Sequence, residues 1–478
     1  MSRKLSKSLF CLAVLALLTT LAVAQEARPG AASAQPAPAA PDAVTPSPSA
    51  QLEGLPVVRE QLANGLRVVL SPDRTVPTVA IAIYYDVGSR NEVRGRSGFA
   101  HLFEHMMFQG SANVGKGEHF RLVMNRGGSM NGTTSEDRTN YFETLPSNEL
   151  ALGLWLEADR MKSLAVTAEN FENQRATVME ERRQRIDNQP YVPSMLRINE
   201  LAFGDYFPYA HSTIGDMADL EAAPLEAVQQ FFDSYYAPNN AVLSLSGDFD
   251  PTEAMALVRR YFEPIPTRQT PPYQPGELAP QTEERTEILP DPNAPLPAFH
   301  VAFHIPPSRT PDHYALELLS LVLGDGESSR LYQKLVKQRE ILQTIDVSTD
   351  DRRGPDLFSF WGVVSEGHTA AEAREVIYAE LASIAQRGIT ARELEKAHNR
   401  VRSYFVFGLA SNMSRAMQLA EFELYWGDAT LLRNEPAAYL AVTADDVKRV
   451  AGTYFEATNR TVLDVQPLTA PAAEGGAQ

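Results

Sequence analysis

The chain has 478 residues, of which 44% are hydrophobic, a formal net charge of −17 and a single cysteine. A globular chain of this length can bury a substantial core and is long enough for two or more domains. Its acidic balance argues against nucleic acid as the main partner, because a phosphate-binding surface needs clustered Lys and Arg.

The first 24 residues predict a secretory signal peptide. Basic residues at positions 3, 4 and 7 precede an apolar stretch over 9–21, and small residues at 22–24 predict cleavage before Gln25. We therefore expect an exported, periplasmic protein. The alternative is an uncleaved anchor, which the shortness of the apolar stretch disfavours. We expect no membrane span in the mature chain.

The only cysteine, Cys11, lies within this predicted signal peptide. The mature chain then has no thiol, which excludes disulfides, thiolate catalysis and cysteine-ligated zinc. Any metal must be held by His, Asp and Glu side chains.

Residues 25–52 are dominated by Ala, Pro and Ser and predict a disordered tether. After the tether, β-branched and aromatic residues predict strands in "LRVVLSPD", "PTVAIAIYYDVGS" and "NNAVLSLSGDF". Apolar residues at helical spacing predict helices over 96–108, 149–161, 168–187, 224–235 and 251–262.

A proline-rich stretch, "EPIPTRQTPPYQPGELAP", interrupts this pattern and cannot continue a helix or pair as a central strand. We place an N-terminal domain at 53–268, a linker at 269–292 and a C-terminal domain at 293–468. The last residues, 469–478, predict a disordered tail.

The second half of the chain repeats the first. "APNNAVLSLSG", which starts at Ala237, is answered 220 residues later by "ATNRTVLDVQP", which starts at Ala457. Likewise "PTVAIAIYY" is answered by "PAFHVAFHI" and "AHLFEHMMFQG" by "LELLSLVLGDG". A domain-sized duplication explains these pairs and predicts two similar α+β units.

The segment "HLFEHMMFQG" places His101, Glu104 and His105 within an otherwise apolar helix. Positions i, i+3 and i+4 share one helical face. Two imidazoles one turn apart can chelate zinc, and a third carboxylate or imidazole ligand leaves a position for water beside Glu104. A solvated polar stripe is the alternative, because a bare H-x-x-E-H pattern also arises by chance.

From "LANGLRVVLSPD" to "NRTVLDVQP", nearly all of the mature chain, the sequence resembles the pitrilysin (insulinase) family of zinc peptidases with the inverted H-x-x-E-H motif. In size it is similar to bacterial members that resemble the mitochondrial processing peptidase. The resemblance implies an α+β fold of two homologous domains, each a mostly antiparallel sheet packed against helices, together forming half of a clamshell. It also implies one Zn²⁺ per chain.

For the site, the resemblance implies His101 and His105 as zinc ligands and Glu104 as the catalytic base. The third ligand is expected at Glu181 in "ATVMEERRQR", with 75 residues between it and His105. The neighbouring Glu180 is the competing candidate.

The stretch "GGSMNGTTSEDRTNYFETLP" resembles the family's edge strand that holds the substrate. The resemblance implies that Asn131, Gly132 and Thr133 bind an extended peptide through its main chain, a mode that tolerates many side chains. An ordinary hairpin is the alternative. Gly132 stands where the family usually has alanine, and Gln174 stands where several relatives carry a further glutamate beside the metal.

The second domain departs from the family pattern in "SRLYQKLVKQREILQ". Many active relatives carry an arginine and a tyrosine here that hold the substrate carbonyl, and these positions fall on Val336 and Gln343. Neither is a strong oxyanion donor. Arg339 or Tyr332 could replace them only after a local shift.

We therefore predict a zinc-dependent metalloendopeptidase that hydrolyses peptides or unfolded segments in an enclosed chamber. We expect it to act as the zinc-bearing subunit of a heterodimer, with a second family member supplying the Arg/Tyr pair. The implied chemistry is attack by a metal-activated water with Glu104 as base. The alternative is a non-catalytic scaffold or chaperone-like subunit, which the intact motif disfavours.

Overall fold

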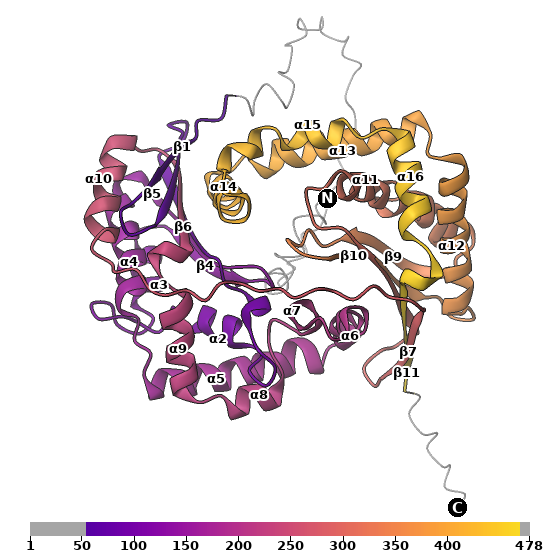
Figure 1. The fold of residues 1–478 in the computed structure, drawn as a ribbon, viewed down its shortest axis with the longest axis horizontal. Coiled ribbons are helices and arrows are strands. Elements are labelled where there is room, and N and C mark those ends of the chain that lie inside the picture. Colours follow the sequence, from indigo (N-terminus) through magenta and orange to yellow (C-terminus); the bar gives the residue numbers. More distant parts are fainter. Residues whose placement is uncertain (1–53, 469–478) are drawn as a thin grey trace, which may run out of the picture.

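The computed structural model describes residues 54–468, which form an α+β protein with two separate β-sheets (Figure 1). The predicted signal peptide, tether and C-terminal tail lie outside the described residues. Across the described part of the chain, no helix has both the length and the apolar character that a membrane crossing would require.

The first sheet has six strands in the order β1-β2-β6-β3-β5-β4. Only β2 and β6 run parallel; the other neighbouring strands are antiparallel. The strands are β1 (Val58–Gln61), β2 (Arg67–Pro72), β3 (Thr78–Tyr85), β4 (Ser129–Thr134), β5 (Thr139–Pro146) and β6 (Ala241–Gly247). The three strands predicted from the sequence are β2, β3 and β6.

The second sheet has five strands in the order β7-β11-β8-β10-β9. Its only parallel pair is β7 with β11. The strands are β7 (Arg285–Asp291), β8 (Ala298–Ile305), β9 (Leu342–Thr349), β10 (Asp356–Val364) and β11 (Arg460–Pro467). Strand for strand, this order repeats β2-β6-β3-β5-β4 with the same directions, which confirms the duplication expected from the sequence.

Helices connect the strands of the first half and include all five that the apolar spacing predicted. They are α2 (Phe99–Met106), α3 (Glu118–Asn125), α4 (Leu150–Ser163), α5 (Ala168–Arg182), α6 (Val192–Phe203), α7 (Phe207–Ala210), α8 (Met217–Ala222), α9 (Leu225–Tyr235) and α10 (Pro251–Phe262). After α5 the helical path continues through one wider turn, η4 (Arg183–Asp187), as far as the predicted end.

The second half is largely helical outside its sheet. Its helices are α11 (Pro311–Gly324), η6 (Tyr332–Gln338), α12 (Ala370–Arg387), α13 (Ala391–Gly408), α14 (Asn412–Trp426), η7 (Ala429–Arg433), α15 (Glu435–Leu440) and α16 (Ala444–Tyr454). Thr369 and Thr390 each begin a helix with a reciprocal bond to a glutamate three residues later. Such capping boxes satisfy otherwise unpaired backbone N–H groups at the first turn.

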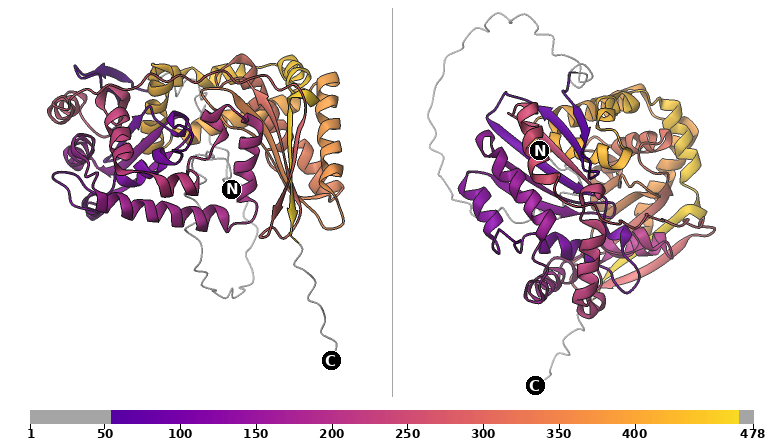
Figure 2. Two further views of the ribbon diagram at one scale, coloured as in Figure 1. Left: turned by 60° about the horizontal axis from the view of Figure 1, so that its bottom comes forward. Right: turned by 60° about the vertical axis from the view of Figure 1, so that its left-hand side comes forward.

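Each sheet is covered on one face by a helix from the other half of the chain. α14 packs on β3, β6 and β2 of the first sheet, and α6 packs on β11 and β8 of the second. Figure 1 shows α14 lying against the first sheet, and Figure 2, left, shows the second sheet between the magenta helix α6 and the orange helices. Each unit in space therefore combines a sheet from one half of the sequence with a covering helix from the other half.

Polar contacts accompany this exchange of helices. Arg415 of α14 pairs with Asp73 at 2.7 Å, and the Asn412 amide donates to the backbone oxygen of Thr78 at 3.2 Å. On the other side, Arg197 of α6 holds both carboxylate oxygens of Glu287 in β7 at 2.8 and 2.6 Å. The two units are thus joined by reciprocal packing rather than by the linker alone.

The segment predicted as a linker, residues 269–292, differs from the structure at its end. Its first part is an extended connection, but residues 285–291 form β7. β7 occupies the outer edge of the second sheet and pairs only with β11. Pro290 is tolerated there because one side of an edge strand needs no backbone donor.

The ion pair between Glu423 in α14 and Arg59 in β1 allows a test of how much the packing of α14 on the first sheet contributes to stability. Glu423 is buried and accepts from Arg59 Nε and Nη2 at 2.6 and 2.9 Å. Removing the carboxylate deletes both of these bonds and leaves the buried Ala429 N–H, which donates to Glu423 Oε2 at 2.9 Å, without its acceptor, so Glu423→Ala should lower the free energy of unfolding by about 2 kcal/mol. Chemical denaturation measures this, and the exposed Glu395→Ala should stay within about 0.5 kcal/mol of wild type.

Candidate metal centre

Helix α2 presents the motif because its opposite side is anchored in the core. Phe99, Leu102, Phe103 and Met106 are buried at its base. Since these apolar residues fix the rotation of the helix, the polar face of the motif turns away from the core. The resulting face carries the three residues that the sequence singled out.

The first turn of α2 is held by a buried carboxylate that the sequence analysis did not identify. Glu92 accepts from the backbone N–H groups of Gly98 and Ala100, both at 2.8 Å. Its third contact is His211 Nε2 at 3.0 Å. A carboxylate at a helix N-terminus satisfies unpaired N–H groups and complements the helix dipole. Glu92 therefore fixes where the motif helix begins.

The predicted ligands converge. Nitrogen atoms of His101 and His105 and a carboxylate oxygen of Glu181 all lie within 4.8 Å of one another. Glu181 Oε2 is 3.2 Å from His105 Nε2 and 3.9 Å from His101 Nε2. The structure thus brings together residues from α2 and α5 that are far apart in the sequence.

Glu180 does not take part in this convergence. Its carboxylate lies on the exposed side of α5, where it contacts Arg183 at 3.3 Å and Gln184 at 2.7 Å. Adjacent helical positions point about 100° apart, so only one of the two glutamates can face α2. The geometry selects Glu181 over Glu180, as expected.

The electrostatics of the three groups are strongly coupled. Burial and the neighbouring His105 lower the pKa of His101 to about 4. For Glu181, burial acts to raise the pKa, but the hydrogen bond with His105 and the charges of both imidazoles and of Arg185 outweigh it and lower the pKa to about 2. Burial also disfavours charge on His105, yet Glu181 raises its pKa overall. Glu181 is therefore held as an anion facing the imidazoles.

Glu104 lies beside these groups on the same face of α2. Thr134 in β4 donates its hydroxyl to Glu104 Oε2 at 2.7 Å. Burial raises the pKa of Glu104 above its ordinary value, although Thr134 and the nearby charge of His105 act in the opposite direction. A carboxylate with a raised pKa and a fixed oxygen is suited to accept and return a proton near neutral pH.

The predicted substrate strand is β4, which forms one edge of the first sheet. Among the described strands it pairs only with β5, so its other edge carries no strand. Asn131 Oδ1 accepts from the N–H of Gly132 at 2.9 Å, and the buried Thr133 is held from behind by Arg138, which donates to its backbone oxygen at 3.0 Å.

Gly132 sits very close to the side chain of Glu104. A Cβ at this position would lie 3.1 Å from Glu104 Cγ and 3.0 Å from Cδ1 of Tyr141. Both distances are shorter than ordinary van der Waals contact, so the alanine usual in the family would require these side chains to shift. The glycine therefore leaves room for the present position of Glu104.

Gln174 in α5 is the residue for which the resemblance implied a further glutamate in several relatives. The Gln174 side chain is buried and hydrogen-bonds to His105, and its amide donates to Asn173 Oδ1 at 2.8 Å. A neutral amide can orient the imidazole but adds no negative charge beside it. The missing outer carboxylate expected from the sequence is thus replaced by an amide in contact with His105.

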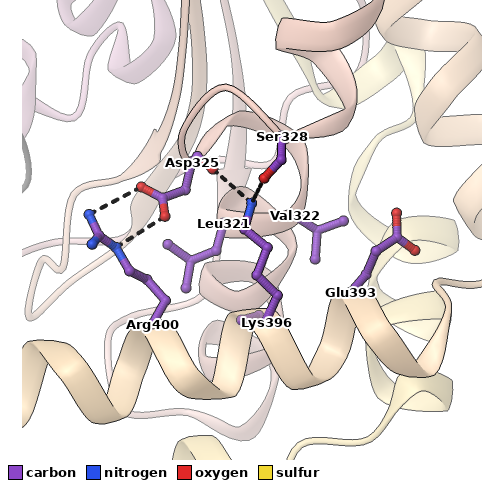
Figure 3. A pocket seen from close by; sticks show the side chains of 8 residues that line it. Leu321, Val322, Asp325, Ser328, Glu393, Lys396 and Arg400 are labelled. Atoms are coloured by element: carbon purple, nitrogen blue, oxygen red, sulfur yellow. Dashed lines mark hydrogen bonds and ion pairs between the residues drawn. The ribbon is translucent and has the colours of Figure 1, made fainter. Parts of the chain in front are cut away.

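The second unit has no copy of this centre at the matching place. α13 packs on α11 as α5 packs on α2, but the position matching His105 is the buried Leu321. Figure 3 shows this part of the interface, where Lys396 contacts Ser328 and the Asp325 backbone oxygen at 2.8 and 3.1 Å and Arg400 pairs with the Asp325 carboxylate. Apolar packing and surface ion pairs therefore take the place that the candidate metal ligands have in the first unit.

The segment aligned with the family's Arg/Tyr pair is ordinary packing and surface. Val336 packs against the second hydrophobic core, and Gln343 is exposed on the edge strand β9. Tyr332 is partly buried against the same core, and Arg339 is exposed. None of the four makes a described contact with the His101–Glu181 centre.

Besides Glu92, the sequence analysis missed two residues that contact the site directly. Thr134 fixes Glu104, and Arg185 contacts Glu181 Oε1 at 2.6 Å from one turn along the chain. The i, i+4 spacing of Glu181 and Arg185 on one helix could have indicated their ion pair from the sequence. No local pattern pointed from β4 to α2, so Thr134 required the tertiary structure.

Family models match most of the described chain. The one described as insulinase (peptidase family M16) matches residues 67–203, and the one described as the peptidase M16 inactive domain matches residues 223–401. A zinc protease, PqqE, of Helicobacter pylori is 30% identical over 415 residues, which are 85% of this chain and 92% of that protein. The chain belongs to the M16 peptidase family.

Other relatives agree with this assignment. A probable mitochondrial-processing peptidase subunit beta of Arabidopsis thaliana is 23% identical and covers 85% of this chain and 78% of its own. The crystal structure of a protease from Helicobacter pylori superposes with a TM-score of 0.82 at 29% identity, over 86% of this chain and 100% of that one. A peptidase M16 inactive domain from Pseudomonas fluorescens, at 18% identity and a TM-score of 0.78, covers 87% and 99% and supports the fold.

The centre fits a zinc ion. Two imidazoles and one carboxylate are a donor set that zinc prefers in catalytic sites. His101 makes no hydrogen bond among the described residues, because its Nδ1 is buried without a partner and its Nε2 is 3.9 Å from Glu181. Burying an imidazole in this way is unfavourable unless another bond compensates, and a metal on Nε2 would supply that bond.

The low pKa of His101 predicts acid sensitivity of the metal-free protein. Its pKa is about 4 rather than 6.5, so the unfolded chain takes up a proton first as the pH falls. Stability is therefore fully present above pH 6.5 and is lost as the pH falls toward 4, by about 3 kcal/mol. In EDTA-treated protein, His101→Gln should remove most of this loss between pH 7 and pH 4.

Urea denaturation at several pH values measures this effect. His368→Gln, which changes a histidine of the second unit, is the matched control and should follow wild type. An unchanged pH profile in His101→Gln would contradict the buried, neutral state of this imidazole.

Proposed function

We propose that this chain is a zinc-dependent endopeptidase whose ion is held by His101, His105 and Glu181. The observation that carries the proposal is the convergence of these three groups beside Glu104 and next to an open strand edge. The names of the relatives as zinc proteases support it.

When bound, zinc supplies Lewis acidity and lowers the pKa of an attacking water. Glu104 takes the proton of that water as the carbonyl carbon is attacked and then delivers it to the leaving amine. Thr134 keeps one oxygen of Glu104 in place during both transfers. No covalent bond to the protein forms in this mechanism.

The substrate is proposed to bind as an added strand along β4. Its backbone would pair with the free edge at Asn131, Gly132 and Thr133, while Arg138 keeps this strand in position from the inner side. Main-chain pairing selects extended peptides or unfolded segments rather than one side-chain sequence.

We further propose that the chain acts in an enclosed chamber with a second family member as partner. Val336 is packed in a core and Gln343 is a neutral amide, so this chain has no cation and phenol at the positions where relatives hold the substrate carbonyl. A partner that carries this pair would complete the site. The predicted signal peptide supports a periplasmic location.

A non-catalytic scaffold is the second candidate. Its support is the same absence of an Arg/Tyr pair, together with the match of residues 223–401 to a domain described as inactive. A scaffold would have no turnover to lose when Glu104 is changed.

Glu104→Gln should therefore abolish peptide cleavage while zinc stays bound. Loss of a general base typically costs about 10²–10⁴-fold in rate. The measurement is hydrolysis of a quenched fluorescent peptide library, with zinc determined on the same samples. Glu169→Gln, which makes the same chemical change at an exposed position in the first turn of α5, is the matched control and should cleave like wild type.

Glu181 and Glu180 form a matched pair for the third ligand. Glu181→Ala should lose zinc during dialysis, because only two protein ligands remain, whereas Glu180→Ala should retain one ion per chain. Metal analysis after gel filtration measures this. Equal zinc content in the two variants would overturn the proposed ligand set.

The partner proposal is tested with the purified chain alone. It should contain zinc at the first centre but cleave the peptide library far more slowly than a mixture with a family member that carries the Arg/Tyr pair. Full activity of the isolated chain would refute the division of labour and leave the zinc site itself intact.

A further inference from the structure

The second unit carries another metal-type cluster on the helix that corresponds to α2. α11 follows β8 as α2 follows β3, and it bears His313 and Glu317 one turn apart. In the repeat, Glu317 stands at the position of His101. The same arrangement of two ligand-type residues at i and i+4 therefore recurs one turn earlier along the helix.

A third group from a distant loop completes the cluster. Ligand atoms of His313, Glu317 and Asp351 all lie within 4.8 Å of one another. His313 Nε2 is 3.7 Å from Asp351 Oδ1 and 3.1 Å from Asp356 Oδ2. Tyr439 donates its hydroxyl to one oxygen of Glu317 at 2.5 Å. The imidazole nitrogen thus points into a group of carboxylates.

The imidazole itself is almost fully enclosed. His313 is 1% exposed, and its Nδ1 is buried without a hydrogen-bond partner. His101 in the first centre also has a partnerless Nδ1, but its Nε2 makes no hydrogen bond, whereas His313 Nε2 is hydrogen-bonded to Asp356. A buried ring with one orphaned nitrogen gains more from a strong bond at Nε2 than an exposed ring does.

The charges around the cluster do not balance. Two cations, His313 and Arg352, face five carboxylates within the ion-pair and ligand distances given for this region: Glu136, Glu317, Asp350, Asp351 and Asp356. Arg352 is shared among Glu136, Asp350 and Asp356, at 3.9, 3.2 and 3.4 Å. The carboxylates near His313 are therefore left with a negative excess that favours an added cation.

We propose that His313, Glu317 and Asp351 bind a second divalent metal ion of the zinc or manganese class. The ion would replace the proton on His313 Nε2 and with it the hydrogen bond to Asp356, so one positive charge becomes two and the negative excess falls. One imidazole with carboxylates suits these metals, whereas calcium and magnesium prefer oxygen donors alone. Asp351 is 61% exposed, which leaves the ion a route of entry from solvent.

The location of Asp351 gives the ion a structural role. Asp351 lies in the loop between β9 and β10 with a φ of +60°, a left-handed conformation that a metal bond would help to hold. The next two residues contact the first half of the chain. Arg352 donates to Asn199 at 3.3 Å, and Arg353 contacts Asp86 at 2.7 Å and, through its backbone N–H, Asp137 at 3.0 Å.

Asp137 belongs to the loop that joins β4 to β5, so the contact reaches the strand beside the first centre. An ion at Asp351 would therefore fix the loop through which the second unit contacts the substrate-strand hairpin. This inference rests on the His313 cluster and its surroundings and does not depend on the proposed peptidase activity.

The test counts metal ions in the full-length mature chain. A His101→Ala/His105→Ala variant removes the first centre, and zinc and manganese are titrated separately into this metal-free protein by calorimetry. We expect one remaining ion per chain, and two in wild type. Adding Glu317→Gln or Asp351→Asn to the double variant should weaken this binding at least about tenfold.

Glu327→Gln, a change of an exposed glutamate in the loop after α11, is the matched control and should bind like its parent. Circular dichroism and thermal melting of each variant establish that it is folded, and the metal should raise the melting temperature of the parent but not of Asp351→Asn. No binding by the His101/His105 variant, or binding that Glu317→Gln and Asp351→Asn leave unchanged, would overturn the proposal. Either result would leave the zinc peptidase test at Glu104 unaffected.

Discussion

The packing of α2 against α5 is the contact on which the candidate centre depends. The apolar residues at the base of α2 bury that side of the helix and turn His101 and His105 toward α5, which places Glu181 opposite them. The buried Glu92 fixes the start of α2 through two backbone hydrogen bonds. A change in the rotation or start of either helix would separate the ligands before it affected the rest of the core.

Burial and pairing act in opposite directions within this centre. Burial alone would neutralise all of its titratable groups, since charge is disfavoured away from water. His101 follows that tendency, with a pKa of about 4, while Glu181 remains an anion with a pKa of about 2 because two imidazoles and Arg185 surround it. His101 and Glu181 therefore stand in the protonation states that a divalent cation requires of its ligands, whereas Glu181 raises the pKa of His105, whose proton a bound cation would displace.

Duplication and exchange of helices explain the architecture around the centre. The two sheets share one strand order, yet each is closed by a helix from the other half, α14 on the first and α6 on the second. Neither half can bury both faces of its own sheet without the other, so the two units are expected to fold together. The same exchange brings the β9–β10 loop of the second unit against the β4–β5 loop of the first.

Sequence alone determined the local elements and the motif. Apolar spacing and β-branched runs are local properties, so the strands β2, β3 and β6 and the five predicted helices were recognisable without tertiary information. Internal repetition indicated the duplicated units, and the family resemblance pointed to Glu181 at its distance along the chain.

Only the tertiary structure decided which groups meet. The contact of Thr134 with Glu104, the cap supplied by Glu92 and the exchange of α6 and α14 join residues that are separated in sequence, and no periodic pattern encodes such pairs. The same holds for Asp351 beside His313 and for β7, which follows the proline-rich stretch within the predicted linker and forms a strand by pairing with β11. Local residue patterns set the direction in which side chains face along one element, whereas the positions of elements relative to one another follow from the packing of the whole chain.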